Sequence, residues 1–398
     1  MLTNKQERLT FIFSLLFIAF LFLPALGYFF HFPKGLLAGY IESGAVKPPT
    51  LVKGWFDKQL QPYLEGIINK DIGFKPLYVR LFNDLTFRLF KEQEQTGIIF
   101  TKQHGLYYGS SLIQLNNEYL QRDYLTQVYQ QLAKKLLEVQ HLYAAKGKHF
   151  VVVISASKAY VHLDGLGERF LVKPDKNIYD NIASFGRELK KQGVNVVDSG
   201  PILRKFYQKK SIETHPNSGV HWNFYSGCII AKHLYNNIRT TFSNTPSLRC
   251  GLPQYKNPEL IDQDGLIVLN VKSKLNLVKK TPYPTTSARF YDNYLPKLLV
   301  VSDSFMHQII MALDQAKSYS SLTISNYYMT NIKHHPTEAL TYISPPGSET
   351  LEKGILDAAM DSDVVILQMV DYNIPRLGYG FIDPFLKRLH ETAAKAQA

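Results

Sequence analysis

The sequence lacks the residue patterns that mark several common classes of protein. Its 398 residues hold only two cysteines, without histidine neighbours at ligand spacing, so they predict no zinc site. His215 and the pair His334-His335 show no metal-ligand spacing either. The sequence also lacks a phosphate-binding glycine loop, an internal repeat, a basic helix and an RNA-binding signature. We therefore expect no metal, no cofactor and no nucleic-acid partner.

The pairing of Cys228 and Cys250 is left open by the sequence. Two cysteines form a disulfide readily in an oxidising compartment. Cys228, however, lies in the apolar run 227–231, where a free cysteine behaves as a small core residue. Both a disulfide and an unpaired core cysteine are compatible with this pattern.

One long apolar run stands near the N-terminus. Residues 9–30 carry no charge, and a helix of this length spans a hydrocarbon layer of ~30 Å. The preceding tail holds Lys5 and Arg8 against Glu7, which favours a cytoplasmic tail, although lysines beyond the run weaken this asymmetry. We expect residues 1–32 to form a tail and a single-pass anchor, with the rest outside the cytoplasm. Cleavage after residues 25–27 is the alternative, because the small residues Ala25 and Gly27 on either side of Leu26 resemble a signal-peptidase site.

The net charge of +12 and the pI near 9.3 describe a basic surface. The basic residues are scattered along the chain and form no cluster. Outside the cytoplasm, such a surface meets anionic polysaccharide and lipid head groups. A solvated positive surface without a specific partner is the alternative.

Hydrophobic periodicity divides the remaining chain into three parts. Residues 33–54 hold Gly, Pro and short apolar pieces and are expected to form a linker. Residues 55–146 repeat apolar side chains at helical spacing and are expected to be mainly helical. Within residues 147–398, short β-branched runs alternate with helical segments. This alternation predicts an α/β domain, a mostly parallel sheet covered by helices.

Polar residues gather just past the ends of the expected strands. They are residues 155–158, Asp198, residues 302–304 and residues 368–371. In parallel sheets, ligands bind beyond the carboxyl ends of the strands. The sequence therefore predicts a site along this edge of the sheet.

Ser304 and His221 are the residues most suited to chemistry. Ser304 follows the apolar strand run 298–301 and precedes a helical segment, a position in which a nucleophile is held exposed on a sharp turn. His221 lies beside Trp222 at the start of another helical segment. Serine is a weak nucleophile at neutral pH and needs an adjacent base, which the histidine would supply. Their types alone also fit a turn serine and a helix N-terminal histidine.

Seven short pieces in order give a more specific signal. They are Asn69-Lys70-Asp71-Ile72-Gly73-Phe74-Lys75, Gly105-Leu106-Tyr107-Tyr108, Ser155-Ala156-Ser157-Lys158, Val196-Val197-Asp198, His221-Trp222-Asn223, Ser302-Asp303-Ser304-Phe305 and Asp363-Val364-Val365-Ile366-Leu367. Taken together over residues 55–385, they resemble the alginate O-acetyltransferase family, the AlgJ/AlgX-like or DHHW proteins.

The resemblance implies a fold, a site and a reaction. It implies an SGNH-hydrolase-like domain in which Ser304 is the nucleophile and His221 the general base. An acyl-enzyme on Ser304 would pass its acetyl group to a hydroxyl of a periplasmic polysaccharide, with the chain anchored in the inner membrane. A multi-spanning membrane partner would supply the acetyl group. Two other readings remain open: a polysaccharide acetyl esterase, or a non-catalytic subunit of a polysaccharide acetylation or export complex.

Two positions depart from the family pattern. The family often has Asp two residues before the histidine, where this chain has Gly219, and Gly before Asp-Ser, where it has Ser302. We expect another carboxylate to orient the histidine, with Asp198 the first candidate and Asp371 the second. A dyad without an acid is the alternative, and Asp198 also suits a helix N-cap.

Three further residues are candidates for binding. Asn326 and Asn331, downstream of an expected strand, are possible oxyanion or substrate donors, and both also suit turns. Lys158 matches the Ser-Lys piece of the family. It would either pair with an acidic sugar or carboxylate, or cap a helix.

Overall fold

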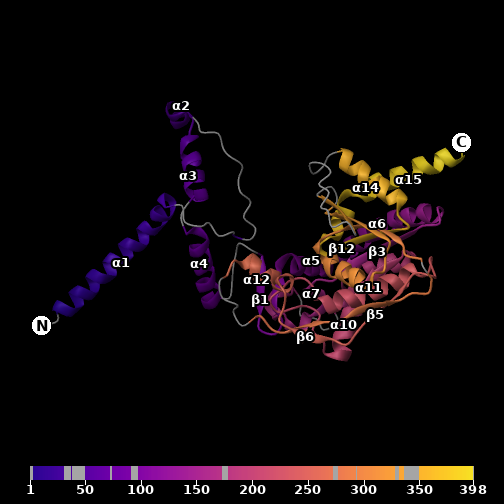
Figure 1. Ribbon diagram of the computed structural model, residues 1–398, viewed down its shortest axis with the longest axis horizontal. Helices are drawn as coiled ribbons and strands as arrows, with labels where there is room; N and C mark the ends of the chain where they lie inside the picture. Colours follow the sequence, from indigo (N-terminus) through magenta and orange to yellow (C-terminus); the bar gives the residue numbers. More distant parts are fainter. Residues whose placement is uncertain are drawn as a thin grey trace. The chain divides into compact units, whose positions relative to one another are not determined.

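The computed structural model describes residues 3–30, 37, 50–71, 74–90, 97–172, 178–271, 277–292, 294–327, 331–335 and 349–397. The chain divides into two compact units (Figure 1). A helical unit comprises Met1–Thr96 and Leu266–Leu275, and a sheet unit comprises Gly97–Gly265 and Asn276–Ala398.

The helical unit begins with the expected apolar helix. Its helices are α1 (Thr3–Phe29), α2 (Leu51–Phe56), α3 (Leu60–Asp71) and α4 (Lys75–Phe90). Among the described residues, α1 is long and apolar enough to cross a membrane, and its segment Gln6–Leu23 has no buried side chain. Such a helix, apolar all round and unburied, suits lipid better than water. Most of the expected linker 33–54 lies outside the described residues.

A six-stranded sheet forms the centre of the sheet unit. Its order is β11 (Asn331–His335), β10 (Ser321–Asn326), β9 (Lys297–Ser302), β12 (Val364–Val370), β3 (His149–Ser155) and β4 (Val196–Asp198). β11 pairs antiparallel with β10, and the other neighbouring strands pair in parallel. The expected mostly parallel sheet is thus confirmed, and its carboxyl edge carries Ser302, Asn326, Ser155, Asp198 and Val370.

Alternate side chains of the central strands build two cores. Val151 and Val300 belong to one hydrophobic cluster, and their strand neighbours Val152 and Leu299 belong to the other. This division explains the continuous β-branched runs, because strands buried on both faces have no polar side.

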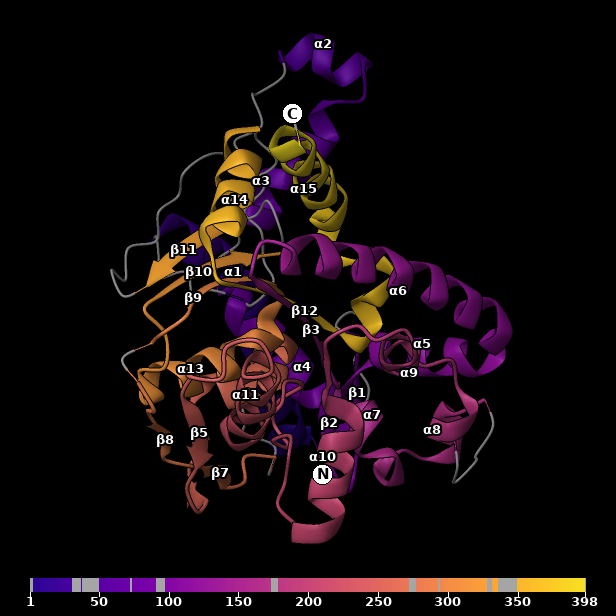
Figure 2. The same ribbon diagram turned by 90° about the vertical axis from the view of Figure 1, so that its right-hand side faces the viewer.

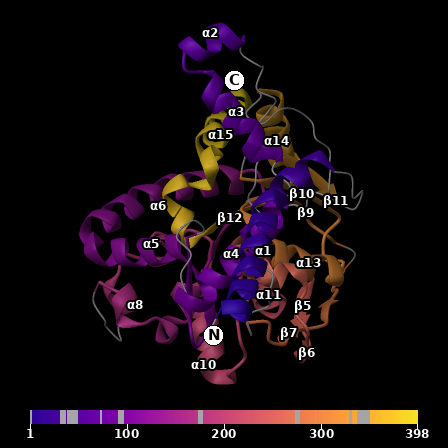
Figure 3. The same ribbon diagram turned by 90° about the vertical axis from the view of Figure 1, so that its left-hand side faces the viewer.

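Helices cover the two faces of the sheet. One face is packed by α11 (Phe224–Ile238) and α13 (His307–Ala316), and the other by α6 (Arg122–Ala144), α9 (Phe185–Lys191), α14 (Glu349–Asp361) and α15 (Ile382–Gln397). Figures 2 and 3 show α11 and α13 on one side of the sheet and α6, α14 and α15 on the other. The remaining helices are α5 (Gly109–Leu120), α7 (Lys158–Val161), α8 (Ile178–Asn181), α10 (Ser199–Lys210) and α12 (Asp264–Leu269).

Short elements surround this three-layer body. β1 (Ile98–Thr101) and β2 (Gly105–Tyr108) form a hairpin within the part of the chain that was expected to be mainly helical. Two small antiparallel pairs follow, β5 (Ser247–Cys250) with β8 (Thr286–Arg289), and β6 (Gln254–Lys256) with β7 (Thr281–Tyr283). Cys228 in α11 and Cys250 in β5 form a disulfide, which answers the question that the sequence left open. Short 3₁₀ turns include η1 (Leu163–Gly165), η2 (Glu168–Phe170), η3 (Leu260–Gln263), η4 (Ser304–Met306), η5 (Asp371–Arg376) and η6 (Gly378–Gly380).

The expected boundary at residue 147 differs from the division in the structure. The sheet unit begins at Gly97, fifty residues earlier, because α6 packs on the sheet. Tyr129 and Leu136 of α6 share a buried cluster with Phe150 of β3. Periodicity identified these residues as helical, but it does not say which core a helix joins.

Candidate active site

Ser304 stands on a turn at the end of β9. The strand ends at Ser302, Asp303 caps the 3₁₀ turn η4, and α13 continues from His307. Asp303 and Phe305 are buried, whereas Ser304 is exposed. The turn therefore presents the serine hydroxyl at the surface, as expected for a nucleophile after a strand.

Asp303 fixes this turn through a saturated set of hydrogen bonds. Its Oδ1 accepts from the N–H of Phe305 at 3.0 Å and from Gln368 Nε2 at 2.9 Å. Its Oδ2 accepts from the N–H of Val370 and from the hydroxyl of Tyr379, both at 2.7 Å. A buried carboxylate with this many donors is rigidly held, so the neighbouring serine has little freedom to move.

His221 lies in the loop before α11. The helix was expected to begin at this histidine, but it begins at Phe224, because Asn223 is the N-cap and its Oδ1 accepts from the N–H of Ser226 at 2.9 Å. The imidazole packs against the ring of Phe305 at a centroid distance of 4.4 Å, which links the loop to the serine turn.

The histidine joins the serine to a carboxylate. His221 Nε2 lies 2.7 Å from Ser304 Oγ, and His221 Nδ1 lies 2.6 Å from Asp264 Oδ2. A carboxylate accepts, so Nδ1 carries the hydrogen and Nε2 is left to accept from the serine hydroxyl. The predicted contact between Ser304 and His221 is confirmed, and the arrangement is that of a Ser-His-Asp triad.

Burial and Asp264 act in opposite directions on the pKa of the histidine. Burial lowers the pKa of His221, but the charge and hydrogen bond of Asp264, together with the charge of Asp303, outweigh it and raise the pKa. The site thus favours the imidazolium that forms when the histidine takes a proton from serine.

Asp198, the first candidate for the orienting acid, occupies a different place. Its strand β4 is separated from β9 by β12 and β3, three strand spacings or roughly 14 Å. Its Oδ1 accepts from the N–H of Gly200 at 3.2 Å, so it is the N-cap of α10. The prediction was wrong because residues at one sheet edge share a side but not a position along it.

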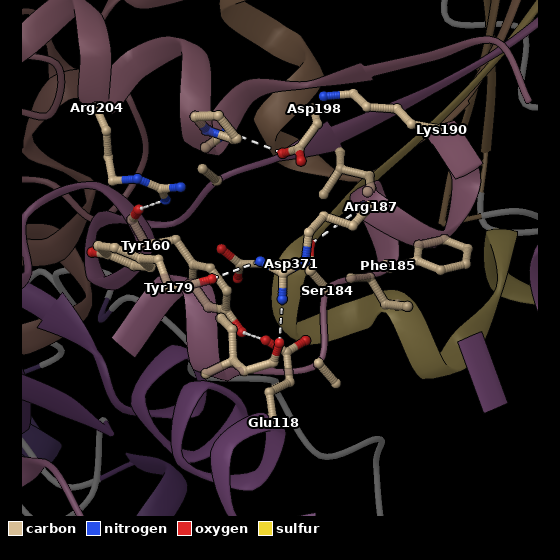
Figure 4. Close-up of a pocket in the computed structure, with 18 of the residues that line it drawn as sticks. Glu118, Tyr160, Tyr179, Ser184, Phe185, Arg187, Lys190, Asp198, Arg204 and Asp371 are labelled. Atoms are coloured by element: carbon tan, nitrogen blue, oxygen red, sulfur yellow. Dashed lines mark hydrogen bonds between the residues drawn. The ribbon is translucent and has the colours of Figure 1, made fainter. Parts of the chain in front are cut away.

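Asp371, the second candidate, is also committed elsewhere. Its Oδ2 accepts from the N–H of Ser157 at 2.6 Å and from the hydroxyl of Ser157 at 2.8 Å. Asp198 and Asp371 both line a cavity of about 280 Å³, together with Glu118 and Arg204 (Figure 4). Burial raises the pKa of both aspartates. This cavity has no triad residue in its lining.

The glycine at position 219 makes room for Asp264, the carboxylate that orients His221 in place of an aspartate at position 219. A Cβ at residue 219 would lie 2.6 Å from Asp264 Oδ1 and 2.8 Å from the carbonyl oxygen of Asp262. Asp264 Oδ1 also accepts from the N–H of Val220 at 3.0 Å. The carboxylate of Asp264 therefore presses on the backbone at the position where the family often has aspartate, and only glycine leaves it room.

Sequence reasoning missed Asp264 for a physical reason. It lies 43 residues after His221, at the start of the short helix α12, with no strand or long helix to mark it. Packing of η3 sets its place: the hydroxyl of Ser218 donates to the carbonyl of Asp262 at 2.9 Å, and the hydroxyl of Tyr283 donates to the Asp262 carboxylate. Spacing along the chain contains no trace of these contacts.

Tyr327 is a second residue that the sequence did not single out. Its hydroxyl lies 3.1 Å from Ser304 Oγ, its ring packs edge-on against Tyr379, and 41% of its surface is exposed. It directly follows β10, and this position just past a strand end could have identified it from the sequence as a candidate site residue. The backbone N–H of Tyr327 donates to the carbonyl of Ser302 at 2.7 Å, which ties the two strand ends together.

The other predicted donors have other surroundings. The hydroxyl of Ser302 is 3.4 Å from Asn326 Oδ1, and Ser302 is buried without disturbing the turn. Asn331 opens β11 and pairs in register with Asn326, and its side chain lies outside the described part of the chain. Its role as an oxyanion or substrate donor stays a prediction.

Lys158 is buried and stabilises the backbone around it, and it does not bind a sugar or carboxylate at the surface. Its Nζ donates to the carbonyl oxygens of His104 at 3.0 Å, Pro216 at 2.7 Å and Gly219 at 2.8 Å. The side chain is 1% exposed, and burial lowers its pKa to about 7. The lysine therefore holds the loop that carries His221, and neither of the two predicted roles describes it.

Comparison with known proteins finds matches among solved structures. No family model matches the chain, and no curated protein matches it. The O-acetyltransferase domain of Pseudomonas putida AlgJ is 17% identical, with a TM-score of 0.44, over 74% of this chain and 99% of that one. Pseudomonas aeruginosa AlgX is 12% identical, with a TM-score of 0.41, over 72% and 66%. Bacillus cereus PatB1 with a sulfonyl adduct is 13% identical, with a TM-score of 0.41, over 71% and 99%.

The predicted resemblance to AlgJ/AlgX-like proteins is thus found among solved structures. At TM-scores below 0.5, this likeness carries no argument about the function of this chain. The case for function rests on the hydrogen bonds that join Ser304, His221 and Asp264.

Proposed function

We propose that this chain is a membrane-anchored O-acetyltransferase that forms an acyl-enzyme on Ser304 and passes the acetyl group to a polysaccharide hydroxyl. The observation that carries the proposal is the continuous path from Ser304 Oγ through His221 to Asp264, with contacts of 2.7 and 2.6 Å. Each residue has the polarity that its role requires: an exposed hydroxyl, a base with a free Nε2 and a fixed carboxylate.

In the first half-reaction, Ser304 Oγ attacks the acetyl carbonyl carbon of the donor. His221 Nε2 takes the serine proton, and Asp264 stabilises the resulting imidazolium. The bond to the leaving group breaks, the leaving group takes the proton from His221, and the acetyl ester remains on Ser304.

In the second half-reaction, a sugar hydroxyl attacks the acetyl ester on Ser304. His221 takes the proton of that hydroxyl and returns it to Ser304 Oγ as the acyl bond breaks. The products are an O-acetyl sugar and free enzyme. With water in place of the sugar the same steps give acetate, so the acceptor alone separates a transferase from an esterase.

Both half-reactions develop negative charge on the carbonyl oxygen. Tyr327 suits the role of a donor to this oxyanion, because its hydroxyl already lies 3.1 Å from Ser304 Oγ. The backbone N–H groups at the start of η4 suit it as well. Tyr327→Phe removes the hydroxyl while keeping the ring, and so separates hydrogen bonding from packing.

The open setting of the nucleophile favours a large acceptor. Ser304 is exposed, and 41% of the surface of Tyr327 is exposed beside it. An aromatic ring with a polar tip is suited to lie against a sugar, with its face on the apolar side and its hydroxyl toward the hydroxyl groups. The net charge of +12 would draw an anionic polymer toward this surface.

The proposed location is the inner membrane, with the sheet unit in the periplasm. Helix α1 is long and apolar enough to be the anchor, and the Cys228–Cys250 disulfide belongs to an oxidising compartment. Acetyl-CoA is cytoplasmic, so we infer a multi-spanning membrane partner that carries the acetyl group across.

The test uses the purified full chain in detergent with an activated acetyl ester. Intact-mass measurement should show one added acetyl group on the wild type, peptide mapping should place it on Ser304, and Ser304→Ala should show none. Adding an oligosaccharide should remove the group from the protein and yield acetylated sugar.

Each other outcome identifies a competing function. Release of acetate with no sugar product would make the protein an esterase. An unmodified serine with every activated ester tried, in a folded protein, would favour a non-catalytic subunit. The location is tested separately by a reporter fused after Ala398, which should be active only outside the cytoplasm.

A further inference from the structure

A second group of ionisable residues lies apart from the triad in the sheet unit. His104 occupies the turn between β1 and β2, His162 follows α7, and Asp164 lies in η1. Figure 2 shows β1, β2 and α7 beside one another. One ring nitrogen of each histidine and one carboxylate oxygen of Asp164 lie within 4.8 Å of one another.

The hydrogen bonds around His162 fix its tautomer. His215 Nε2 lies 3.2 Å from the carbonyl of Ala156, so that nitrogen carries hydrogen and His215 Nδ1 accepts. The hydroxyl of Thr214 therefore donates to His215 Nδ1, at 3.0 Å. Having donated its hydrogen, Thr214 Oγ1 can only accept from His162 Nε2, at 2.6 Å. The lone pair of His162 is consequently on Nδ1.

This lone pair is buried without a partner. His162 is 0% exposed, and its Nδ1 has no hydrogen bond within the described residues. A buried polar atom left in this way is unfavourable unless an ion or another group fills the place. The tautomer is the one that a neutral imidazole needs to bind a metal through Nδ1.

His104 has the surroundings of a metal ligand as well. Its Nδ1 lies 3.4 Å from Glu213 Oε1, and its Nε2 lies 3.4 Å from Asp164 Oδ2. A metal-bound histidine commonly donates its other N–H to a carboxylate, as Nδ1 would to Glu213 here. Nε2 and Asp164 would then face the same ion, as two of its ligands.

We propose that His104, His162 and Asp164 bind a divalent transition-metal ion, with Zn²⁺ the preferred one, through two imidazole nitrogens and one carboxylate oxygen. Two imidazole nitrogens and one carboxylate oxygen are a donor set found in zinc sites with three protein ligands. Imidazole favours Zn²⁺ over Mg²⁺ or Ca²⁺, which prefer oxygen ligands.

The spacing of the atoms supports this assignment. Bonds of about 2.0–2.1 Å in a tetrahedral site place neighbouring ligand atoms roughly 3.3 Å apart. The 3.4 Å between His104 Nε2 and Asp164 Oδ2 already matches this separation. The two imidazole rings lie with centroids 4.4 Å apart and planes tilted by 31°. His162 is held by its 2.6 Å contact with Thr214, so the ring of His104, whose two contacts are both 3.4 Å, is the one that would turn toward the ion. The Asp164 side chain is 63% exposed and free to follow.

The site would brace the loop of the general base. Lys158 donates to the carbonyl of His104 and to the carbonyl of Gly219, two residues before His221. An ion on His104 and His162 therefore ties the β1–β2 turn to the segment after α7, close to this lysine. The expected effect is to stabilise this loop, because the site shares no residue with Ser304, His221 and Asp264.

Zinc binding by the full chain tests the proposal directly. The protein, purified in detergent and stripped with chelator, is titrated with Zn²⁺ by calorimetry, and bound metal is counted after dialysis. We expect one Zn²⁺ per chain, a melting temperature that rises with Zn²⁺ concentration, and no comparable effect of Mg²⁺.

Three variants make the test specific. Asp164→Asn changes an exposed side chain, so the protein should fold, and it should lose most of the Zn²⁺ affinity. Glu213→Gln removes the proposed partner of His104 Nδ1 and should weaken binding about 10- to 100-fold. His390→Gln is the matched control, because His390 is an exposed histidine paired with Glu138, and it should bind Zn²⁺ as the wild type does.

Two results would overturn the proposal. One is a stripped wild-type protein that takes up no Zn²⁺, which would make His104 an imidazolium held between Asp164 and Glu213. The other is binding that Asp164→Asn and His390→Gln leave equally strong, which would place the ion elsewhere. Neither result bears on the acetyl-transfer reaction, which has its own readout.

Discussion

Replacing Asp264 by asparagine should disable the histidine without disturbing the fold. Asparagine has nearly the shape of aspartate, but one of its two polar atoms donates. In the native site, Asp264 Oδ1 accepts from the N–H of Val220 and Oδ2 accepts from His221 Nδ1. The amide oxygen can serve only one of these donors.

The orientation that keeps the backbone hydrogen bond is the damaging one. With its oxygen on the N–H of Val220, the asparagine turns its NH₂ toward His221 Nδ1. The histidine then loses hydrogen from Nδ1 and carries it on Nε2, the nitrogen that must accept from Ser304. In serine proteases the corresponding change costs about 10⁴ in turnover. The same loss here corresponds to roughly 5.4 kcal/mol of transition-state stabilisation.

Single-turnover acetylation by an activated ester measures this loss. The assay follows acetyl-Ser304 by intact mass over time, for the wild type, Asp264→Asn and Asp198→Asn. Asp198 is the matched control, because it is also a partly buried aspartate at a helix N-terminus, but it caps α10 and is no partner of His221. Thermal unfolding of each variant separates slow chemistry from a damaged fold.

Near wild-type acetylation by a folded Asp264→Asn protein would refute the triad. A large loss in Asp198→Asn with little in Asp264→Asn would show that the acid had been assigned to the wrong residue. If both variants remained active, a Ser304–His221 dyad would be the surviving account.

Three further predictions follow from the same contacts. The acetylation rate should fall at low pH with a midpoint above about 6.5, because the raised pKa of His221 keeps Nε2 protonated and unable to accept; in Asp264→Asn, this midpoint should move to lower pH. The double variant Cys228→Ser/Cys250→Ser removes a disulfide between residues 22 apart and should lower the free energy of unfolding by ~3 kcal/mol in denaturant titrations. No change would mean that the cysteines are unpaired in the native protein. Lys158→Met leaves three carbonyl oxygens without their donor, which costs roughly 1–3 kcal/mol each, offset in part because the variant buries no charge. The melting temperature of this variant should therefore drop well below that of a Lys134→Met control at an exposed lysine.

The sequence by itself determined the central sheet and the surface position of the serine. Strands such as β3 and β12 are continuous apolar runs, and a strand buried on both faces allows no other composition. Ser304 lies two residues after the end of such a strand, so its position at the sheet edge could be predicted from the neighbouring residues in the sequence. The N-terminal apolar helix could be predicted from the length of its run and the absence of charge alone.

Only the tertiary structure decided which residues complete the site. Asp264 and His221 are 43 residues apart, and they meet because η3 packs against the loop around Gly219. Asp198 stands at the expected edge, but three strands from the serine. His104 and His162 are likewise brought together by contact between the β1–β2 hairpin and the segment after α7. Periodicity reports which face of an element is buried, whereas contacts between loops depend on the packing of the elements that carry them.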